Sequence, residues 1–488
     1  MKLNFTSNKL FFYLTLLISG IVFYFVFLKA NITSFTHDES FTYLHYVHMD
    51  FLDILSFKHP YTNNHILNTL LIKYSEKIFG NSEIALRTPS IIALLIYFAY
   101  SIKLIKSINK NLAIFFFCFM ILNPYLLEFF ALARGYGLSI SFMIMGLYYF
   151  LNYLKTNKSK DGVIFHLACL LAILSNFSLL NFYVACLITF NLIKIIESII
   201  KKNTFQFLKI NKIHFICITI SFIVLFEPIR RLSNLPALDF GGKDGFIKDT
   251  VVSIINTLLY NTVISNSLIT VLAYSLSVLF ILVFIFILKN VIKRNLEFVL
   301  ENSRMIALNF ILLLCALANI AQHYFLNNDY FNGRFALFFY PLFILNLILF
   351  FDYLYRKQIK SLIVSISLIS SILLMINLYT NYNPNYFYDW HNDIDTKKIM
   401  KALVEDHQKE NENTKSVTLG VNWLFEPVTN FYRVTWDLKW LKETNRNGIS
   451  QTDDYYCIFK NDTIAYTVLY KPLLFSSNNS NAILIKNN

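Results

Sequence analysis

The chain has 488 residues, of which 56% are hydrophobic and only 15% are charged, and its formal net charge is +13. Because a soluble globular domain contains about 25% charged residues, this composition excludes an ordinary soluble protein. Apolar runs near the ~20 residues needed to cross a bilayer recur along the chain. They do not alternate with polar residues at every second position, which also excludes a membrane β-barrel. The sequence therefore predicts an all-α polytopic membrane protein.

We expect about eleven membrane-spanning helices, each identified from one long apolar run. The first run follows Lys2 and Lys9 and has no small-residue cleavage site, which is typical of a retained signal anchor. The predicted spans are 10–29, 84–102, 112–130, 136–154, 162–176, 179–198, 213–229, 267–288, 305–325, 335–351 and 361–379.

The basic residues predict the orientation of these spans. Lys and Arg gather in the short loops after the second, fourth, sixth, eighth and tenth spans, as cytoplasmic loops do. This pattern predicts a multi-pass protein of the cytoplasmic membrane with a cytoplasmic N-terminus and an extracytoplasmic C-terminal tail. It also accounts for the positive net charge, and no basic soluble module indicates nucleic-acid binding.

Two outer loops are too long for simple turns. The first, 31–83, contains a predicted helix at 64–79 whose apolar face favours a position in the membrane interface. The second, 230–265, has the centre LDFGGKDGF at 238–246, which is typical of a mobile loop.

The tail is aqueous in composition and predicts a small α/β domain. We expect a helix near 393–409 and strands near 416–421, 454–459 and 481–486. The chain is thus divided into a membrane domain, 1–380, and a C-terminal extracytoplasmic domain, 381–488.

Two adjacent acids, Asp38 and Glu39, follow the first span in the stretch FTHDESFTYL. An acid pair in a polar loop is most often merely solvated. Here aromatic residues follow the pair instead of further charges, so we expect the carboxylates at a protein-lined, partly desolvated surface. A carboxylate in such a place can act as a base or bind a cation.

Several cations are predicted on the same side of the membrane as these acids. Interfacial snorkelling is the alternative explanation for each of them taken alone. Arginine at the end of a span is nevertheless often functional, and its guanidinium binds phosphate through paired hydrogen bonds. The candidates are Arg134 in FALARGYGL, Arg334 in NNDYFNGRFALFFYPL, Arg230 and Arg231 after the seventh span, and Lys58 and His65 in the first loop.

Four stretches together resemble the GT-C membrane glycosyltransferases, in the bacterial branch similar to protein O-mannosyltransferases and lipid A aminoarabinose transferases. They are THDESFTYL, NNHILNTLLIKYSEKIFGNSEIALRTPSIIALL, NPYLLEFFALARGYGLSISF and GRFALFFYPLFIL. Their order and spacing carry the resemblance, which covers the N-terminal third and one late segment. It implies a GT-C-like fold with interfacial helices in the first outer loop and a role in the bacterial cell envelope.

The resemblance also implies a reaction. A sugar linked to a polyprenyl phosphate would move, with inversion, to a lipid, glycan or protein acceptor on the outer face of the membrane. Asp38 would be the catalytic base, and Glu39 would orient the acceptor or support Asp38. Arg134 and Arg334 would hold the donor phosphate, with the other four cations as further candidates.

The sequence departs from the family pattern in one respect that bears on the site. Relatives often carry an acid directly before the Ala-Arg pair, where this chain has Leu132, and its nearest acid is Glu128. Some GT-C branches use a divalent metal, but the sequence shows no ligand set beyond Asp38 and Glu39. No metal site or cofactor is therefore assigned, and metal dependence stays open.

Two other classes of protein share some of these features. A transporter or flippase of a lipid-linked or anionic substrate would also have many spans, but transporters tend to show internal repeats and helices broken by Gly or Pro. With 12 Gly and 9 Pro in the chain, that class is less favoured. An assembly protein could use the tail aromatics Trp423, Trp436 and Trp440 to bind a partner, although these side chains equally suit the core of a small domain.

Overall fold

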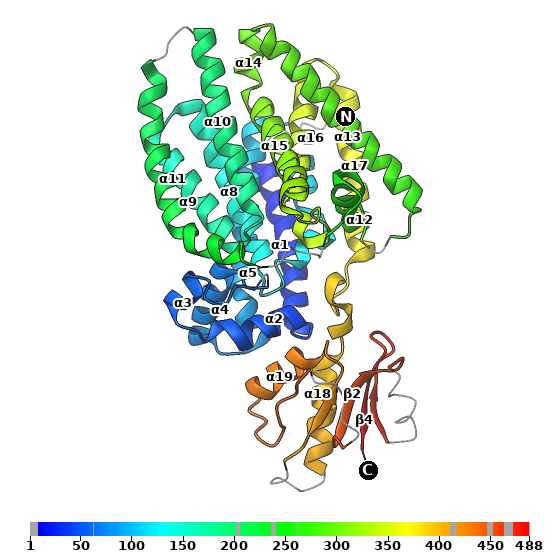
Figure 1. The fold of residues 1–488 in the computed structure, drawn as a ribbon. Helices are drawn as coiled ribbons and strands as arrows, with labels where there is room; N and C mark the ends of the chain where they lie inside the picture. The colour runs from blue at the N-terminus through cyan, green and yellow to red at the C-terminus, as the bar shows by residue number, and fades with distance from the viewer. Residues whose placement is uncertain are drawn as a thin grey trace. The chain divides into compact units, whose positions relative to one another are not determined.

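The computed structural model describes residues 8–61, 63–201, 205–235, 241–260, 262–409, 416–446, 452–462 and 472–487. Most of the described chain is helical, and a small sheet lies near the C-terminus (Figure 1). The chain forms two compact units. Unit 1 contains residues 1–23, 92–130 and 135–382, and unit 2 contains residues 24–91, 131–134 and 383–488.

Eleven long or apolar helices occupy the positions of the predicted spans. Eight of them contain, within the described residues, a segment long and apolar enough to cross a membrane, so the chain is a multi-pass membrane protein. The eight are α1 (Asn8–Ile32), α5 (Glu83–Ile108), α8 (Gly135–Thr156), α10 (Leu179–Lys201), α13 (Asn266–Ile292), α15 (Ser303–Leu326), α16 (Phe339–Arg356) and α17 (Lys360–Asn381). The other three are α6 (Ala113–Ile121), α9 (Ser159–Ser175) and α11 (Phe205–Leu232).

The span predicted at 112–130 is interrupted in the structure. Helix α6 ends at Ile121, and a short helix, α7, runs from Pro124 to Glu128. The Asn123 side chain accepts a hydrogen bond from the Leu126 amide at 3.0 Å and caps α7. Because Pro124 lacks an amide hydrogen, it suits the start of a new helix better than the continuation of the old one.

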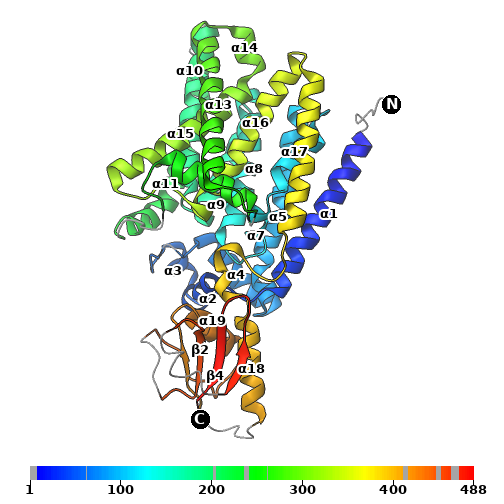
Figure 2. The ribbon, with the colours of Figure 1, turned by 90° about the vertical axis from the view of Figure 1, so that its right-hand side faces the viewer.

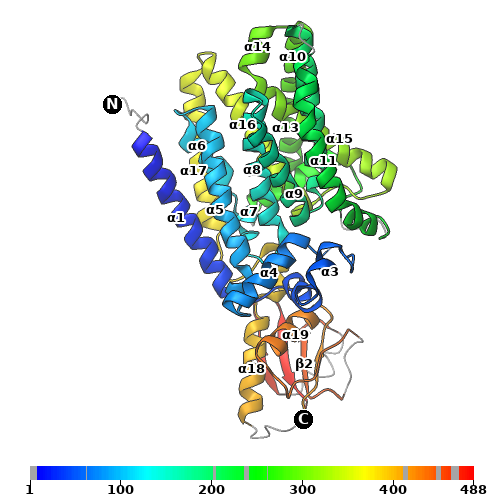
Figure 3. The ribbon, with the colours of Figure 1, turned by 90° about the vertical axis from the view of Figure 1, so that its left-hand side faces the viewer.

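Unit 1 is a bundle of packed helices. Helices α8 and α9 form a hairpin, α11 packs on α9, and α10 packs on α15 (Figure 1). Helix α6 packs against α17, as the view onto the left-hand side of Figure 1 shows (Figure 3). At Gly146 of α8, an added Cβ would lie 3.3 Å from the Cys169 Sγ of α9, so a small residue allows these helices to approach closely. The short elements of unit 1 are the π-helix η2 (Phe246–Val251), α12 (Val252–Leu259), α14 (Leu296–Glu301) and the 3₁₀ helix η3 (Gly333–Ala336).

The second outer loop is anchored where the structure describes it. The Asp249 carboxylate accepts hydrogen bonds from the amides of Asp244 and Gly245, both at 2.8 Å. An added Cβ at Gly242 would lie 2.0 Å from the Asp249 Cγ, so only glycine fits there. The mobile loop predicted at 238–246 is therefore held in place from residue 241 onward, and residues 238–240 lie outside the described residues.

In unit 2, the first outer loop is mostly helical. It contains α2 (His37–Thr42), the π-helix η1 (Tyr43–Val47), α3 (Phe51–Leu55) and α4 (Ile66–Phe79), the last of which matches the helix predicted at 64–79.

The C-terminal part of unit 2 is the predicted small α/β structure. The sheet order is β1-β2-β4-β3, with β1 and β2 parallel and the other neighbours antiparallel. Helix α18 packs against β3 and β4 (Figure 2). The predicted helix and strands correspond to α18, β1, β2 and β4, whereas α19 and β3 were not predicted. The bounds are η4 (Tyr388–Asp393), α18 (Thr396–Lys409), β1 (Leu419–Val421), α19 (Glu426–Thr435), β2 (Tyr455–Phe459), β3 (Leu473–Ser476) and β4 (Ala482–Lys486).

One hydrophobic core joins the two parts of unit 2. Phe35 and Val47 of the first outer loop belong to the same buried cluster as Leu403, Val428 and Leu484 of the tail. The rings of Phe35 and Phe431 stack at 4.1 Å between centroids. The tail therefore packs on the loop that carries the acid pair, and the domain boundary predicted at residues 380 and 381 stays a prediction.

We expect Leu484→Ala to lower the free energy of unfolding of unit 2 by about 2–5 kcal/mol, because truncation of a fully buried leucine leaves a cavity. All four tryptophans of the chain belong to unit 2, so their fluorescence during urea unfolding in detergent reports on this unit. Leu473→Ala is the matched control, because Leu473 is 57% exposed and its truncation is expected to cost at most about 0.5 kcal/mol. Equal shifts for the two variants would contradict the shared core.

Candidate functional site

The acid pair lies in the first turn of α2. The Thr36 hydroxyl accepts a hydrogen bond from the Glu39 amide at 3.4 Å, and the Glu39 carboxylate accepts one from the Thr36 amide at 2.9 Å. These reciprocal bonds form a capping box, for which Thr-x-x-Glu is the sequence signature. The sequence THDE therefore begins a helix at a defined residue and fixes the direction in which each acid points.

Glu39 is fully buried and saturated with hydrogen bonds. Its carboxylate pairs with the Arg87 guanidinium through Nε at 2.9 Å and Nη2 at 2.7 Å, and both side chains are 0% exposed. The Ala133 amide donates a further hydrogen bond to Glu39 at 2.6 Å. With the bond from Thr36, four donors converge on this carboxylate.

The remaining hydrogens of Arg87 are also used. Its Nη1 donates to the carbonyls of Ala30 and Thr33 at 2.8 and 3.0 Å, and its Nη2 donates to the Ser34 carbonyl at 2.8 Å. These carbonyls belong to the end of α1 and the segment that follows it. A buried ion pair is tolerated only when its polar groups are satisfied in this way, so Arg87 fixes the path from α1 to α2.

Asp38 has a different environment from its neighbour. Its side chain is 15% exposed, and its Oδ2 lies 3.8 Å from the Nη2 of Arg134, which is 1% exposed. Arg134 is held in turn, because its Nη1 donates to the Thr42 hydroxyl at 3.0 Å and to the Asn63 carbonyl at 2.8 Å. The structure therefore brings Asp38 and Arg134 together in unit 2 and leaves part of Asp38 accessible.

The other predicted cations are placed as follows. Lys58 forms an exposed ion pair with Asp53 at 2.7 Å, and His65 is buried directly before α4. In unit 1, Arg230 and Arg231 both pair with Glu227 on α11 at 2.7 and 2.6 Å, and Arg334 lies in η3 with its guanidinium 5.5 Å from the Phe335 ring. Because these three arginines belong to the other unit, their grouping with Asp38 stays a prediction.

Two residues of the site were not assigned a role from the sequence. The first is Arg87, which lies within one of the family-like stretches. For Glu39, which the resemblance assigned to orienting the acceptor or supporting Asp38, the Thr-x-x-Glu signature is the local signal of a structural role. The second residue, Asp393, is buried and accepts a hydrogen bond from the His37 amide at 2.7 Å. Burial, together with the negative charges of Asp38 and Glu39, raises the pKa of Asp393 well above its ordinary value, although the bond from His37 opposes this.

The two acids as placed do not suit a divalent cation. The Glu39 oxygens accept hydrogen bonds from four donors, and Asp38 faces a guanidinium, whereas Mg²⁺ or Ca²⁺ takes several free oxygen ligands. Over the part of the chain that the structure describes, no group of three or more His, Cys, Asp or Glu is placed to hold a metal ion.

Unit 1 contains an apolar groove of about 560 Å³ between α13, α15 and α16. Asp244 and Lys248 are among its few charged lining residues. Its walls are otherwise dominated by apolar and aromatic side chains, including Phe246, Tyr274, Phe280, Phe284, Leu312 and Phe343. A groove of this composition suits a lipid chain.

We expect Glu39→Gln to lower the free energy of unfolding of unit 2 by about 3–5 kcal/mol, because it leaves the buried Arg87 charge without its counter-ion. Tryptophan fluorescence during urea unfolding in detergent measures this change. Asp53→Asn, which breaks the exposed pair with Lys58, is the control and is expected to change stability little. Wild-type stability in Glu39→Gln would show that the ion pair does not support the loop.

Asp393→Asn should make the stability of unit 2 less dependent on pH. The native pKa of Asp393 is raised above its unfolded value, so its contribution to stability is full at low pH and is lost as the pH rises through the native pKa. Asparagine keeps an acceptor for the His37 amide and does not titrate. Urea unfolding between about pH 4 and pH 8 should therefore show a smaller loss of stability in the variant than in the wild type.

The control for this variant is Asp437→Asn, because the Asp437 side chain is 77% exposed. It should keep the wild-type pH dependence. If Asp393→Asn also kept that dependence, the carboxyl group of Asp393 would not be the group that titrates.

The chain resembles known proteins in part of its sequence and in its fold. Residues 58–226 match the family model described as dolichyl-phosphate-mannose-protein mannosyltransferase. Among curated protein sequences, none matches the chain. The apo crystal structure of ArnT from Cupriavidus metallidurans matches with a TM-score of 0.50 and 9% identity over 97% of both chains, which shows a shared fold.

Two further structures match with lower scores. ArnT from the same organism bound to undecaprenyl phosphate has a TM-score of 0.46 and 10% identity over 99% of both chains. The Archaeoglobus fulgidus oligosaccharyltransferase in complex with Zn and sulfate has a TM-score of 0.47 and 12% identity, over 93% of this chain and 68% of that one. The family match over 58–226 and the fold shared with ArnT together support a membrane glycosyltransferase of the GT-C superfamily.

Proposed function

We propose that the protein moves a sugar from a polyprenyl-phosphate donor to a hydroxyl acceptor at the extracytoplasmic face of the cytoplasmic membrane, with Asp38 as the base. The contrast between the two neighbouring acids carries this proposal. Asp38 is 15% exposed, whereas Glu39 is 0% exposed and saturated by hydrogen bonds. Of the two carboxylates, Asp38 is therefore the one that a substrate can reach.

In this reaction, the Asp38 carboxylate accepts the proton of the acceptor hydroxyl as the hydroxyl oxygen attacks the anomeric carbon. The bond between that carbon and the donor phosphate oxygen breaks, and its electron pair leaves with the polyprenyl phosphate. Attack from the face opposite the leaving group inverts the anomeric configuration. The positive charge that develops on the sugar ring also favours a nearby carboxylate, as in glycoside hydrolysis.

The cations have separate tasks in this proposal. Arg134, which the resemblance assigned to the donor phosphate, is proposed instead to orient the Asp38 carboxylate, because Thr42 and Asn63 fix its guanidinium beside that group. Arg334 is the first candidate for binding the donor phosphate and stabilising the charge on the leaving group. Arg230, Arg231 and Lys58 are already paired with carboxylates and would have to exchange these partners for the phosphate.

A lipid-linked donor is supported by two observations. The family model that matches residues 58–226 is described by a dolichyl-phosphate-mannose donor. The groove between α13, α15 and α16 has the apolar lining that a polyprenyl chain requires. The acceptor in this proposal is a lipid, glycan or protein hydroxyl, and the tail after residue 380 lies on the acceptor side of the membrane.

We expect Asp38→Asn to reduce sugar transfer by roughly 10²–10⁴-fold, because asparagine cannot accept the proton. Transfer is measured with purified protein, radiolabelled polyprenyl-phosphate sugars and extracted cell-envelope acceptors. Donor binding and urea unfolding should remain as in the wild type. Asp437→Asn is the matched control and should keep wild-type activity, because the Asp437 side chain is 77% exposed and has no role in the proposed site.

Two results would overturn the proposal. One is wild-type transfer by a folded Asp38→Asn variant. The other is movement of lipid-linked sugar across vesicles by the wild type without transfer to any acceptor, which would indicate a flippase.

A further inference from the structure

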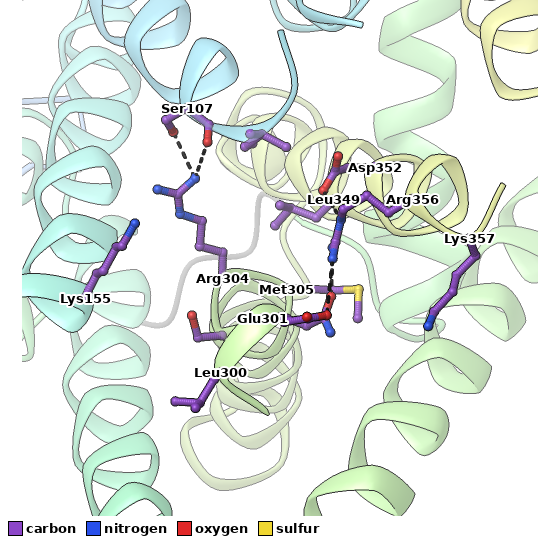
Figure 4. Close-up of a pocket in the computed structure, with 13 residues that line it drawn as sticks. Ser107, Lys155, Leu300, Glu301, Arg304, Met305, Leu349, Asp352, Arg356 and Lys357 are labelled. Atoms are coloured by element: carbon purple, nitrogen blue, oxygen red, sulfur yellow. Dashed lines mark hydrogen bonds and ion pairs between the residues drawn. The ribbon is translucent and has the colours of Figure 1, made fainter. Parts of the chain in front are cut away.

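A polar cavity of about 650 Å³ lies in unit 1 where the ends of several helices meet (Figure 4). The C-terminal ends of α5, α8 and α16 and the N-terminal end of α15 contribute to it. Six charged side chains line it, namely Lys155, Glu301, Arg304, Asp352, Arg356 and Lys357. The cavity therefore contains four cations and two carboxylates.

Both carboxylates of the cavity lie against the same cation. Arg356 Nε is 3.1 Å from the Asp352 Oδ2, and its Nη1 is 4.0 Å from the Glu301 Oε2. Its Nη2 donates to the Asn302 side chain at 2.8 Å. Arg356 is thus fixed in place and neutralised within the cavity wall.

The other three cations are not neutralised in the same way. Arg304 Nη1 donates to the carbonyl and the hydroxyl of Ser107 at 2.6 and 3.2 Å. These uncharged partners hold the Arg304 guanidinium in the cavity wall. In the described parts of the chain, no carboxylate oxygen lies within 4.0 Å of Arg304, Lys155 or Lys357. Figure 4 shows Lys155 and Lys357 on opposite sides of the cavity, with Arg304 between them.

We propose that this cavity binds a phosphate-bearing anion, either the headgroup of an anionic phospholipid or free phosphate. Arginine and lysine provide charge-assisted hydrogen bonds to phosphate oxygens. Apolar residues also line the cavity, including Ile108, Leu300, Met305 and Leu349, which suits the glycerol and upper acyl region of a lipid. The general enrichment of Lys and Arg in cytoplasmic loops explains why basic residues occur at these helix ends. It does not explain why they surround a cavity.

This cavity is separate from the phosphate site proposed for the sugar donor. Arg334 precedes the N-terminal end of α16, whereas Arg356 is its last residue. A helix of 18 residues is about 27 Å long. With the orientation proposed above, the cavity faces the cytoplasmic leaflet, and its occupancy does not depend on sugar transfer.

The test uses native mass spectrometry of the full chain in detergent, with a short-chain phosphatidylglycerol or phosphatidylcholine added. We expect the wild type to bind phosphatidylglycerol at least about tenfold more tightly than phosphatidylcholine. The double variant Lys155→Gln/Lys357→Gln should lose roughly tenfold or more of that affinity. A separate arm follows the thermal shift with inorganic phosphate against the same concentration of chloride.

Lys360→Gln is the matched control, because Lys360 is exposed, lies close to Lys357 in the sequence and does not line the cavity. It should bind as the wild type does. If the wild type bound both lipids equally and still showed a rise in melting temperature with phosphate that the double variant lost, this result would support the proposal with free phosphate as the ligand. Equal binding of both lipids with no phosphate shift, or full binding by a folded double variant, would overturn it.

Arg304→Gln is a weaker test on its own, because Arg304 also holds Ser107 and its loss can disturb the fold. By contrast, no carboxylate oxygen in the described chain lies within 4.0 Å of Lys155 or Lys357, so replacing these lysines breaks no ion pair. The thermal transition of each lysine variant, measured in the phosphate experiment, also shows whether the variant is folded.

Discussion

The conformation of the acid-bearing loop depends on the buried ion pair between Glu39 and Arg87. Neither charge has access to water, so each must find all its partners within the protein. These partners are the end of α1, the start of α2, and the Ala133 amide directly before Arg134. One interaction therefore sets the direction of α2 and places Asp38 beside Arg134. The buried carboxylate of Glu39 thus determines where the partly exposed carboxylate of Asp38 lies.

The C-terminal region takes part in the same arrangement. Asp393 binds the first amide of α2, and the Tyr432 hydroxyl accepts a hydrogen bond from the Phe35 amide at 3.0 Å. The hydrophobic core of the small sheet continues into Phe35 and Val47. A tail of this kind supports the site physically as well as forming part of the surface around it, which differs from the view of the tail as a partner-binding appendage.

The sequence was sufficient for the features that depend on local pattern. Apolar runs predicted the positions of eleven helices, and eight of these are long and apolar enough, within the described residues, to cross a membrane. The acid pair and Arg134 were identified from their position beside spans. The Asn123-Pro124 break and the capping box of Thr36 and Glu39 also have local signatures. They were nevertheless not predicted, since 112–130 was expected to be one continuous span. The partners of the acids were not, because Arg87 is 48 residues from Glu39 and Asp393 is 356 residues from His37. Such pairings are decided by the packing of distant segments, which no local pattern encodes.

The shared core also has a consequence for biosynthesis. Phe35 and Tyr432 are 397 residues apart in the chain, and translation at about 5–20 residues per second separates their appearance by roughly 20–80 s. During that interval the loop between α1 and α5 lacks the tail side chains that complete its hydrophobic core. A precursor without its tail would therefore expose this incomplete core to proteases and chaperones.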